Sequence, residues 1–75
     1  MGSNKIREQL EAVGLEPLWD SATAATFLGV PEATLNQWAY RHVGPAYLKI
    51  GRHRRYRPRV VNEWAESTRR GGDAA

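Results

Sequence analysis

The sequence predicts a mainly α-helical fold with one β-hairpin, and two kinds of signal support this class. Helix-capping residues bracket several runs of apolar residues at helical spacing. A two-residue loop, Gly51-Arg52, joins two segments that read as extended, 46–50 and 53–57, and a glycine at the first loop position favours a type II′ turn. Because the chain has 75 residues and no Cys, one small hydrophobic core must hold this fold together without disulfides.

Two closely spaced helices are expected in the middle of the chain. Asp20 is a suitable N-cap for a helix over residues 21–28, and Gly29 can end that helix in the left-handed conformation. Pro31 suits the first position of the second helix, where its missing N–H is not needed, and this helix should run to about His42. The residues expected at the contact between the two helices are Ala24, Ala25, Leu28, Leu35 and Trp38.

A helix is also expected near each end of the chain. The first covers residues 4–13, and the last begins at Pro58. The predicted organisation is an N-terminal helix and linker (1–18), a compact domain (19–67) and a disordered tail (68–75). The apolar residues that support the two outer helices are Ile6, Leu10, Val13, Val60, Val61 and Trp64.

The large aromatic residues supply most of the expected core. Phe27, Trp38 and Trp64 should be buried, because so small a domain has few other large groups to bury. Trp19 lies just before the expected N-cap, where it can pack against the start of the helix over residues 21–28.

Basic side chains are concentrated in the second half of the chain. Residues 1–40 carry two basic and five acidic side chains, whereas residues 41–75 carry nine basic and three acidic ones. A basic half on a small domain favours an anionic partner, most often nucleic acid, although a solvated basic face explains the same pattern.

The two central helices have the pattern of a helix-turn-helix. Small residues in the first helix and a glycine turn let the second helix cross it closely, with its N-terminal half protruding as a major-groove recognition helix must. Asn36 and Gln37 carry amides that can bond bidentately to adenine, and Arg41 can reach a phosphate or a guanine. The exposed side of this helix also holds Glu32 and Thr34. An ordinary α-helical hairpin with a polar surface is the alternative interpretation.

The predicted hairpin carries a dense cluster of basic side chains: Lys49, Arg52, His53, Arg54, Arg55 and Arg57. Placed directly after a recognition helix, such a hairpin has the shape of a wing that follows the phosphates or enters the adjacent minor groove. Gly51 lets the backbone approach DNA closely, and Tyr47 and Tyr56 can pack across the strands or bond phosphate. Two alternatives stay open: charge that protects an edge strand from aggregation, and stacking of tyrosines such as Tyr40 on single-stranded bases.

Other classes of function find little support in the residues. His42 and His53 are too few for a metal site, and no spacing suggests a catalytic triad, so we expect neither an enzyme nor a cofactor. A nuclease built from His53 and Glu63 is the catalytic alternative. No apolar run approaches the roughly 20 residues of a membrane span and no signal peptide opens the chain. We therefore expect a cytoplasmic protein with no membrane association.

Four segments of the chain, taken in order, resemble a known family. They are Ala24-Ala25-x-x-Leu28-Gly29-Val30-Pro31-x-x-Thr34-Leu35, Gly44-Pro45, Lys49-Ile50-Gly51-Arg52-x-x-Arg55-Tyr56 and Val61-x-x-Trp64. This set resembles the winged helix-turn-helix of the MerR-like and AlpA-like group, the small bacterial and phage DNA-binding domains of the excisionase family. The resemblance runs from Asp20 to about Trp64, which is more than half of the chain.

The resemblance implies a winged helix-turn-helix, with its recognition helix in the major groove of double-stranded DNA and its wing in the neighbouring minor groove. The helix expected over residues 4–13 would be an extra N-terminal helix on this fold. The implied contacts are Pro31, Glu32, Ala33, Thr34 and Gln37 on the helix and Gly51, Arg52, His53 and Arg55 on the wing. Members of the family include recombination directionality factors, which bind repeated sites cooperatively, bend DNA and steer an integrase towards excision. Others regulate transcription.

We therefore expect an excisionase from a phage or mobile element, acting at the nucleoid of a bacterial host. Its partners would be double-stranded DNA, an integrase and, head to tail on DNA, further copies of itself. So small a domain leaves no room for the ligand-sensing part of full MerR regulators. A small transcription regulator of the same fold is the main alternative, and an interaction adaptor that uses the helix over residues 4–13 is a weaker one.

The chain departs from the family pattern at three places. Ala22 and Thr23 stand where the family often has Glu, Arg54 stands where it usually has an apolar residue, and Arg59 stands where it commonly has an acidic one. The first change removes a side chain that helps to cap the helix over residues 21–28. The two arginines add positive charge, which strengthens sequence-independent affinity for DNA.

Overall fold

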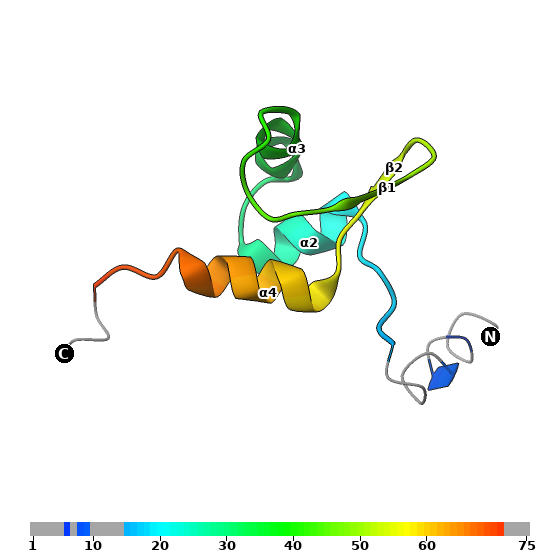
Figure 1. The fold of residues 1–75 in the computed structure, drawn as a ribbon. Coiled ribbons are helices and arrows are strands. Elements are labelled where there is room, and N and C mark those ends of the chain that lie inside the picture. The colour runs from blue at the N-terminus through cyan, green and yellow to red at the C-terminus, as the bar shows by residue number, and fades with distance from the viewer. Residues whose placement is uncertain (1–5, 7, 10–14, 72–75) are drawn as a thin grey trace.

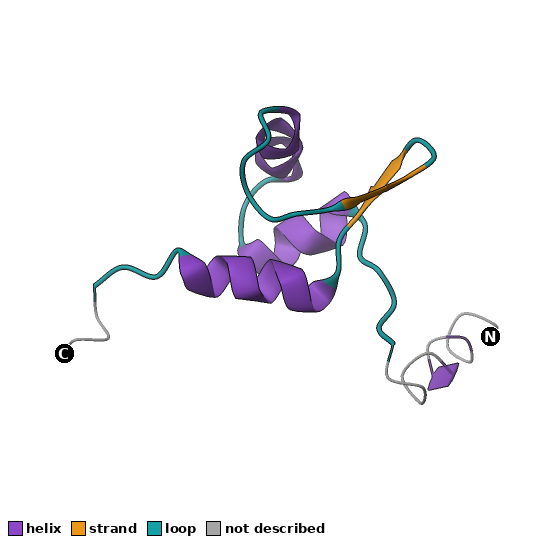
Figure 2. Ribbon diagram, viewed as in Figure 1, coloured by secondary structure: helices purple, strands orange, loops and turns teal. Residues whose placement is uncertain are grey.

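A computed structural model of the chain describes residues 6, 8, 9 and 15–71 and confirms the expected fold class (Figures 1 and 2). The helices are α2 (Ser21–Leu28), α3 (Glu32–Tyr40) and α4 (Pro58–Ser67), and the strands β1 (Leu48–Ile50) and β2 (His53–Arg55) form an antiparallel hairpin between α3 and α4. Of the helix expected over residues 4–13, Ile6, Glu8 and Gln9 are described and are helical. The other residues of that helix and the end of the predicted tail, 72–75, lie outside the described residues.

The predicted bounds of α2 are confirmed, because both of its ends are capped as the sequence indicates. The Asp20 carboxylate accepts a hydrogen bond from the Thr23 N–H at 2.8 Å. At the other end Gly29 is left-handed, with φ 74°, and its N–H donates to the Thr26 carbonyl. The next N–H, that of Val30, donates to the Ala25 carbonyl at 3.0 Å, which completes a Schellman motif.

Helix α3 is shorter than the expected span from Pro31 to His42. Pro31 is the extended N-cap rather than the first helical residue, and its carbonyl accepts from the N–H of Leu35. At the C-terminal end His42 takes a left-handed φ of 60°, and the following Val43 N–H donates to the Trp38 carbonyl. A second Schellman motif therefore ends the helix before His42, with a histidine where glycine is more common.

The hairpin has the predicted two-residue loop, although its strands are shorter than expected. Ile50 pairs with His53 across the loop, and the ladder continues to Leu48 and Arg55. Gly51 has a φ of 62° and is the only loop residue with positive φ, as a type II′ turn requires. Beyond the ladder, the backbones of Trp19 and Tyr56 exchange two hydrogen bonds of 2.8 Å, so the segment before α2 is paired with the base of the hairpin.

A small core joins α2, α3, α4 and the base of the hairpin. Its buried residues are Ala24, Ala25, Leu35, Tyr56 and Val61, with Trp19, Leu28, Val30, Trp38 and Tyr47 packed against them. Trp38 and Trp64 are half-buried rather than buried as expected, and their rings lie against each other, 5.5 Å apart. Phe27 is an exception: it is 48% exposed and instead lies against Trp19, with ring centroids 5.1 Å apart. The expectation that Phe27 is buried is therefore wrong.

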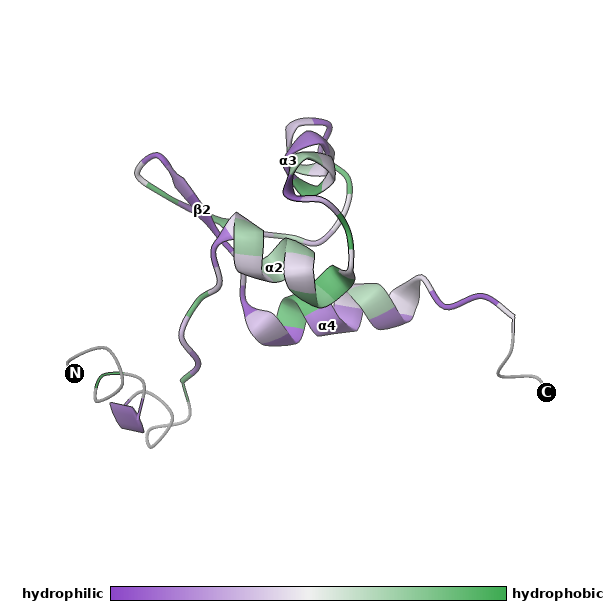
Figure 3. Ribbon diagram, turned by 180° about the vertical axis from the view of Figure 1, so that it is seen from behind, coloured by the Kyte–Doolittle hydropathy of each residue, from purple (hydrophilic) through white to green (hydrophobic). Residues whose placement is uncertain are grey.

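The arrangement leaves α3 and the hairpin projecting from the rest of the domain. Helices α2 and α4 contact each other and form a base whose apolar residues meet between them (Figure 3). Helix α3 and the β1–β2 hairpin both rise from this base on the same side, as the two opposite views show (Figures 1 and 3). Among the residues that the structure describes, no helix combines the length and the apolar character that crossing a membrane requires.

Candidate nucleic-acid interface

The N-terminal half of α3 presents an exposed surface next to the hairpin. Pro31, Glu32, Ala33 and Gln37 are exposed, and Thr34 is half-buried. The helix is held in this position because Leu35 and Ala39, on its other side, are buried in the contact with the base. Exposed polar and small side chains on a protruding helix are what a major-groove reader needs.

The tip of the hairpin presents exposed positive charge. Lys49, Arg52 and His53 are all exposed around Gly51, and β2 is strongly hydrophilic (Figure 3). Within the described part of the chain, neither Lys49 nor Arg52 has a carboxylate within ion-pair distance. Their charge is therefore available to phosphate groups, which supply most of the salt-dependent affinity of DNA-binding proteins.

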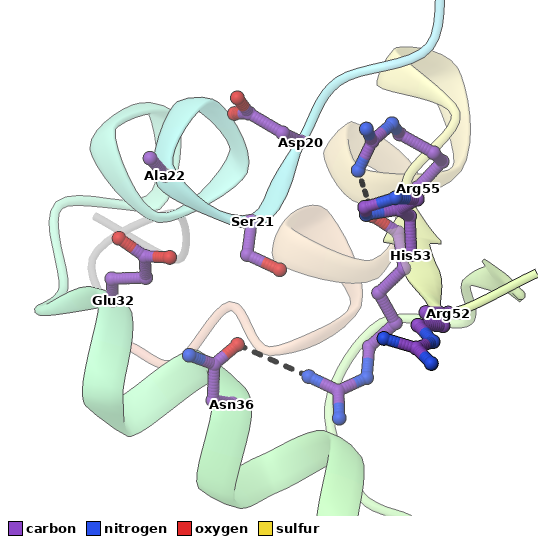
Figure 4. Close-up of a pocket in the computed structure, with 9 residues that line it drawn as sticks. Asp20, Ser21, Ala22, Glu32, Asn36, Arg52, His53 and Arg55 are labelled. Carbon is purple, nitrogen blue, oxygen red and sulfur yellow. Dashed lines mark hydrogen bonds between the residues drawn. The ribbon is translucent and has the colours of Figure 1, made fainter.

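A cleft of about 440 Å³ lies between the hairpin and the N-terminal ends of α2 and α3 (Figure 4). It is lined by Asp20, Ser21, Ala22, Glu32, Asn36, Arg52, His53, Arg54 and Arg55. The Glu32 carboxylate points into this space from α3, opposite the basic side chains of the hairpin (Figure 4). The cleft thus brings the predicted helix and wing residues together, and it adds the start of α2, which the sequence identified only as a capped helix end.

Arg54 and Asn36 are bonded to each other. The Arg54 Nη1 donates to the Asn36 Oδ1 at 3.1 Å, and the Arg54 guanidinium lies over the Tyr47 ring, 5.4 Å from its centroid. Both partners are half-buried. The prediction that Asn36 offers a free amide to DNA therefore needs correction: its oxygen already accepts a bond from the hairpin, whereas the exposed Gln37 amide makes no such bond among the described residues.

Arg55 is also held within the domain. Its Nη1 donates to the Arg54 carbonyl at 2.9 Å, and the side chain is half-buried. Its charge acts on Asp20: the Thr23 N–H bond, and to a lesser extent the Arg55 guanidinium, hold the pKa of the Asp20 carboxyl below its usual value. Arg55 is therefore less free to move towards a phosphate than Arg52.

Tyr56 does not lie on the candidate interface, contrary to its predicted place among the wing contacts. It is fully buried, at 0% exposure, and its ring lies 5.9 Å from that of Tyr47, as the predicted packing across the strands requires. Burial raises the pKa of the Tyr56 phenol, which favours the neutral form. Its pairing with Trp19 is a long-range contact that no local pattern in the sequence announces.

Arg41 and Tyr40 lie at the far end of α3 from the cleft-lining residues. Arg41 is the exposed C-cap of the helix, so its predicted reach towards a phosphate is not obstructed. Tyr40 is 82% exposed, which leaves its ring uncovered. The remaining predicted wing cation, Arg57, is exposed and is the N-cap of α4.

This geometry defines the class of the domain as a small winged helix-turn-helix: α2 and α3 form the helix pair, and the β1–β2 hairpin forms the wing. A family profile described as helix-turn-helix domain matches residues 20–69, two thirds of the 75-residue chain. The chain belongs to this helix-turn-helix family, whose fold implies DNA as a partner. No curated protein sequence matches the chain.

Proposed function

We propose that the chain binds double-stranded DNA sequence-specifically, with α3 in the major groove and the wing in the adjacent minor groove. The observation that carries this proposal is that the exposed half of α3 and the basic wing tip rise from the same side of the α2–α4 base (Figure 1). One duplex can meet both surfaces, because the two grooves alternate along its face.

Different residues would supply affinity and specificity in this complex. Arg52 and Lys49 would neutralise phosphates, and Arg52 at the wing tip is also placed to enter the minor groove, whose negative potential attracts arginine. Gln37 would read a base edge through its amide, since neither of its polar atoms bonds another of the described residues and both can bond bidentately to adenine. In this proposal the chain itself catalyses no reaction and uses no cofactor.

Binding to labelled duplexes at several salt concentrations tests this assignment. A random-sequence duplex and a duplex selected by the wild-type chain from a random library serve as probes. Arg52→Ala should weaken binding to both probes equally and lower the slope of log affinity against log salt by about one. Gln37→Ala should instead weaken binding to the selected duplex by about 1–3 kcal/mol and leave the slope unchanged.

Arg70→Ala is the matched control, because it removes the same charge beyond the end of α4, away from the wing. It should change the slope less than Arg52→Ala does. Equal effects of the two substitutions would mean that net charge, rather than the wing, drives binding. Failure of the wild-type chain to bind either duplex would exclude the proposed function.

The finer proposal is that the protein is an excisionase-type architectural factor of a phage or mobile element. The resemblance to the excisionase family supports it, and the additional arginine at position 59 strengthens the positive field. In this role several copies would bind attachment-site DNA cooperatively, head to tail, and would direct an integrase to excision. The protein would act at the nucleoid, in the cytoplasm of a bacterial host.

A small transcription regulator of the same fold is the second candidate, since the same interface serves both roles. A recombination assay separates them: the chain is added to the integrase encoded nearest to its gene, with DNA that carries the attachment sites of that integrase. A rise in excision yield supports the excisionase. An unchanged yield, with binding confined to a promoter, favours the regulator.

A further inference from the structure

Arg54 differs from the other exposed or half-exposed cations of the wing in what its guanidinium contacts. It donates to the Asn36 Oδ1 of α3 at 3.1 Å and lies 5.4 Å from the centre of the Tyr47 ring. The bond joins residues 18 positions apart and is the one side-chain hydrogen bond between wing and helix among the described residues. A charged donor in a half-buried site forms a stronger bond than the same donor in water.

The chemistry of the pair determines which way the Asn36 amide faces. A guanidinium has only donors, so the atom of Asn36 that meets Arg54 must be the carbonyl oxygen. The amide NH₂ group is consequently turned away from the wing, as the close-up shows (Figure 4). Without this bond the amide could turn over at little cost, and its donor and acceptor would exchange places.

We propose that Arg54 is a positioning residue, which couples the wing to the recognition helix and orients the Asn36 amide for base reading. This inference rests on the proposed DNA binding and assigns different roles to Arg54, which positions, and Asn36, which reads a base. Asn36 meets the major groove with its NH₂ group foremost, which suits acceptors such as purine N7, guanine O6 or thymine O4. Arg54 contributes to specificity through Asn36 and makes no phosphate contact of its own.

The test compares Arg54→Leu, which places at this position the apolar type of residue that is usual in the excisionase family, with Asn36→Ala and with the double variant. Affinities are measured for the random duplex and the selected duplex, over a range of salt concentrations. Each single variant should lower the ratio of selected to random affinity by about fivefold to tenfold, and the double variant should lower it no further. The salt slope should stay at the wild-type value, in contrast to the slope of Arg52→Ala.

A conservative variant and a measurement without DNA separate positioning from general loss of structure. Arg54→Lys still donates one hydrogen bond, so it should recover part of the lost ratio. In the free protein, Arg54→Leu should shift the NMR resonances of the Asn36 side-chain amide, whereas Arg52→Ala should leave them in place. Circular dichroism should show the same helix content for every variant.

The results that would contradict this inference can be told apart from one another. A salt slope that falls by about one in Arg54→Leu would identify Arg54 as a phosphate contact and overturn the inference. Additive losses in the double variant would overturn it as well, because they would show that the two residues act independently. If the wild-type chain binds no duplex, the proposed function fails together with this inference; if it binds and only the coupling is missing, the inference alone fails.

Discussion

Gly44 lies directly against the indole of Trp38. A Cβ at position 44 would come within 3.1 Å of both the Cβ and the Cε3 of Trp38, and Gly44 has a left-handed φ of 83°. Trp38 in turn packs on Trp64 of α4, with ring centroids 5.5 Å apart. The turn after α3 therefore supports the contact between α3 and α4 from the outside.

Replacement of this glycine should destabilise the domain. Gly44→Ala should lower the free energy of unfolding by about 3 kcal/mol, from backbone strain and from the displaced indole together. Gly29→Ala is the control: its φ is 74°, but a Cβ there has no neighbour within 4 Å, so only the strain of about 1 kcal/mol remains. Urea unfolding followed by tryptophan fluorescence measures both. Equal losses would show that Trp38 moves aside freely.

Replacement of the left-handed His42 by glycine should stabilise the domain. A non-glycine residue in this conformation is strained, and the exposed imidazole gains nothing from packing. His42→Gly should therefore raise the free energy of unfolding by about 1 kcal/mol. His42→Ala keeps the Cβ and should stay near the wild-type value. A drop in stability on His42→Gly would mean that the imidazole makes a contact of its own in solution.

The buried hydroxyl of Tyr56 should be dispensable for stability. It makes no hydrogen bond to the residues that the structure describes, so no protein bond offsets its removal from bulk water. Tyr56→Phe should leave the free energy of unfolding unchanged or raise it by up to about 1 kcal/mol. Tyr56→Leu, which also removes the ring that meets Tyr47, should lower it by about 2 kcal/mol. Thermal unfolding of the wild type and the two variants measures these differences. A loss of stability in Tyr56→Phe would contradict the expectation that the hydroxyl is dispensable.

The Asp20 cap makes a part of the stability depend on pH. Folding lowers the pKa of this carboxyl, so its contribution is complete above the pKa of the unfolded residue, about 3.9, and is lost as the pH falls through the lower, folded value. Asp20→Ala should reduce the free energy of unfolding by about 1 kcal/mol at pH 7, and this difference should shrink towards zero in acid. Asp20→Asn, which caps without titrating, should keep most of the stability at both pH values. A difference that persists in acid would argue against the cap as its source.

The elements with local signals could be predicted from the sequence. Helix α2 begins and ends where Asp20 and Gly29 indicate, and the loop at Gly51 sets the register of the hairpin. The fold class and the membership in a helix-turn-helix family follow from these local features, because the capping and turn residues act within a few positions of themselves. The sequence predicts too long a helix α3, because nothing in the residue type of His42 indicates a helix end. In the structure His42 takes the left-handed conformation that is more common for glycine.

The candidate interface could be predicted only in part, because its errors concern contacts between distant segments. Tyr56 was expected on the DNA side but is buried in the core, with its backbone paired to Trp19, and Phe27 is exposed and lies against Trp19 instead of in the core. Asn36 was expected to be free, yet Arg54 reaches it from the wing. Periodicity places a side chain on a face of its own helix or strand, but it cannot say which other segment covers that face.

The paired backbones of Trp19 and Tyr56 also indicate where the smallest fragment of this chain that folds on its own should begin. The family match starts at residue 20, yet the two 2.8 Å bonds that close the base of the wing come from the residue before it. A fragment cut at residue 20 would keep α2, α3, α4 and both strands and still lose this closure. It would also lose the ring that shelters one side of Phe27. Any shortened version intended for crystals with DNA should therefore retain Trp19 together with the residues immediately before it.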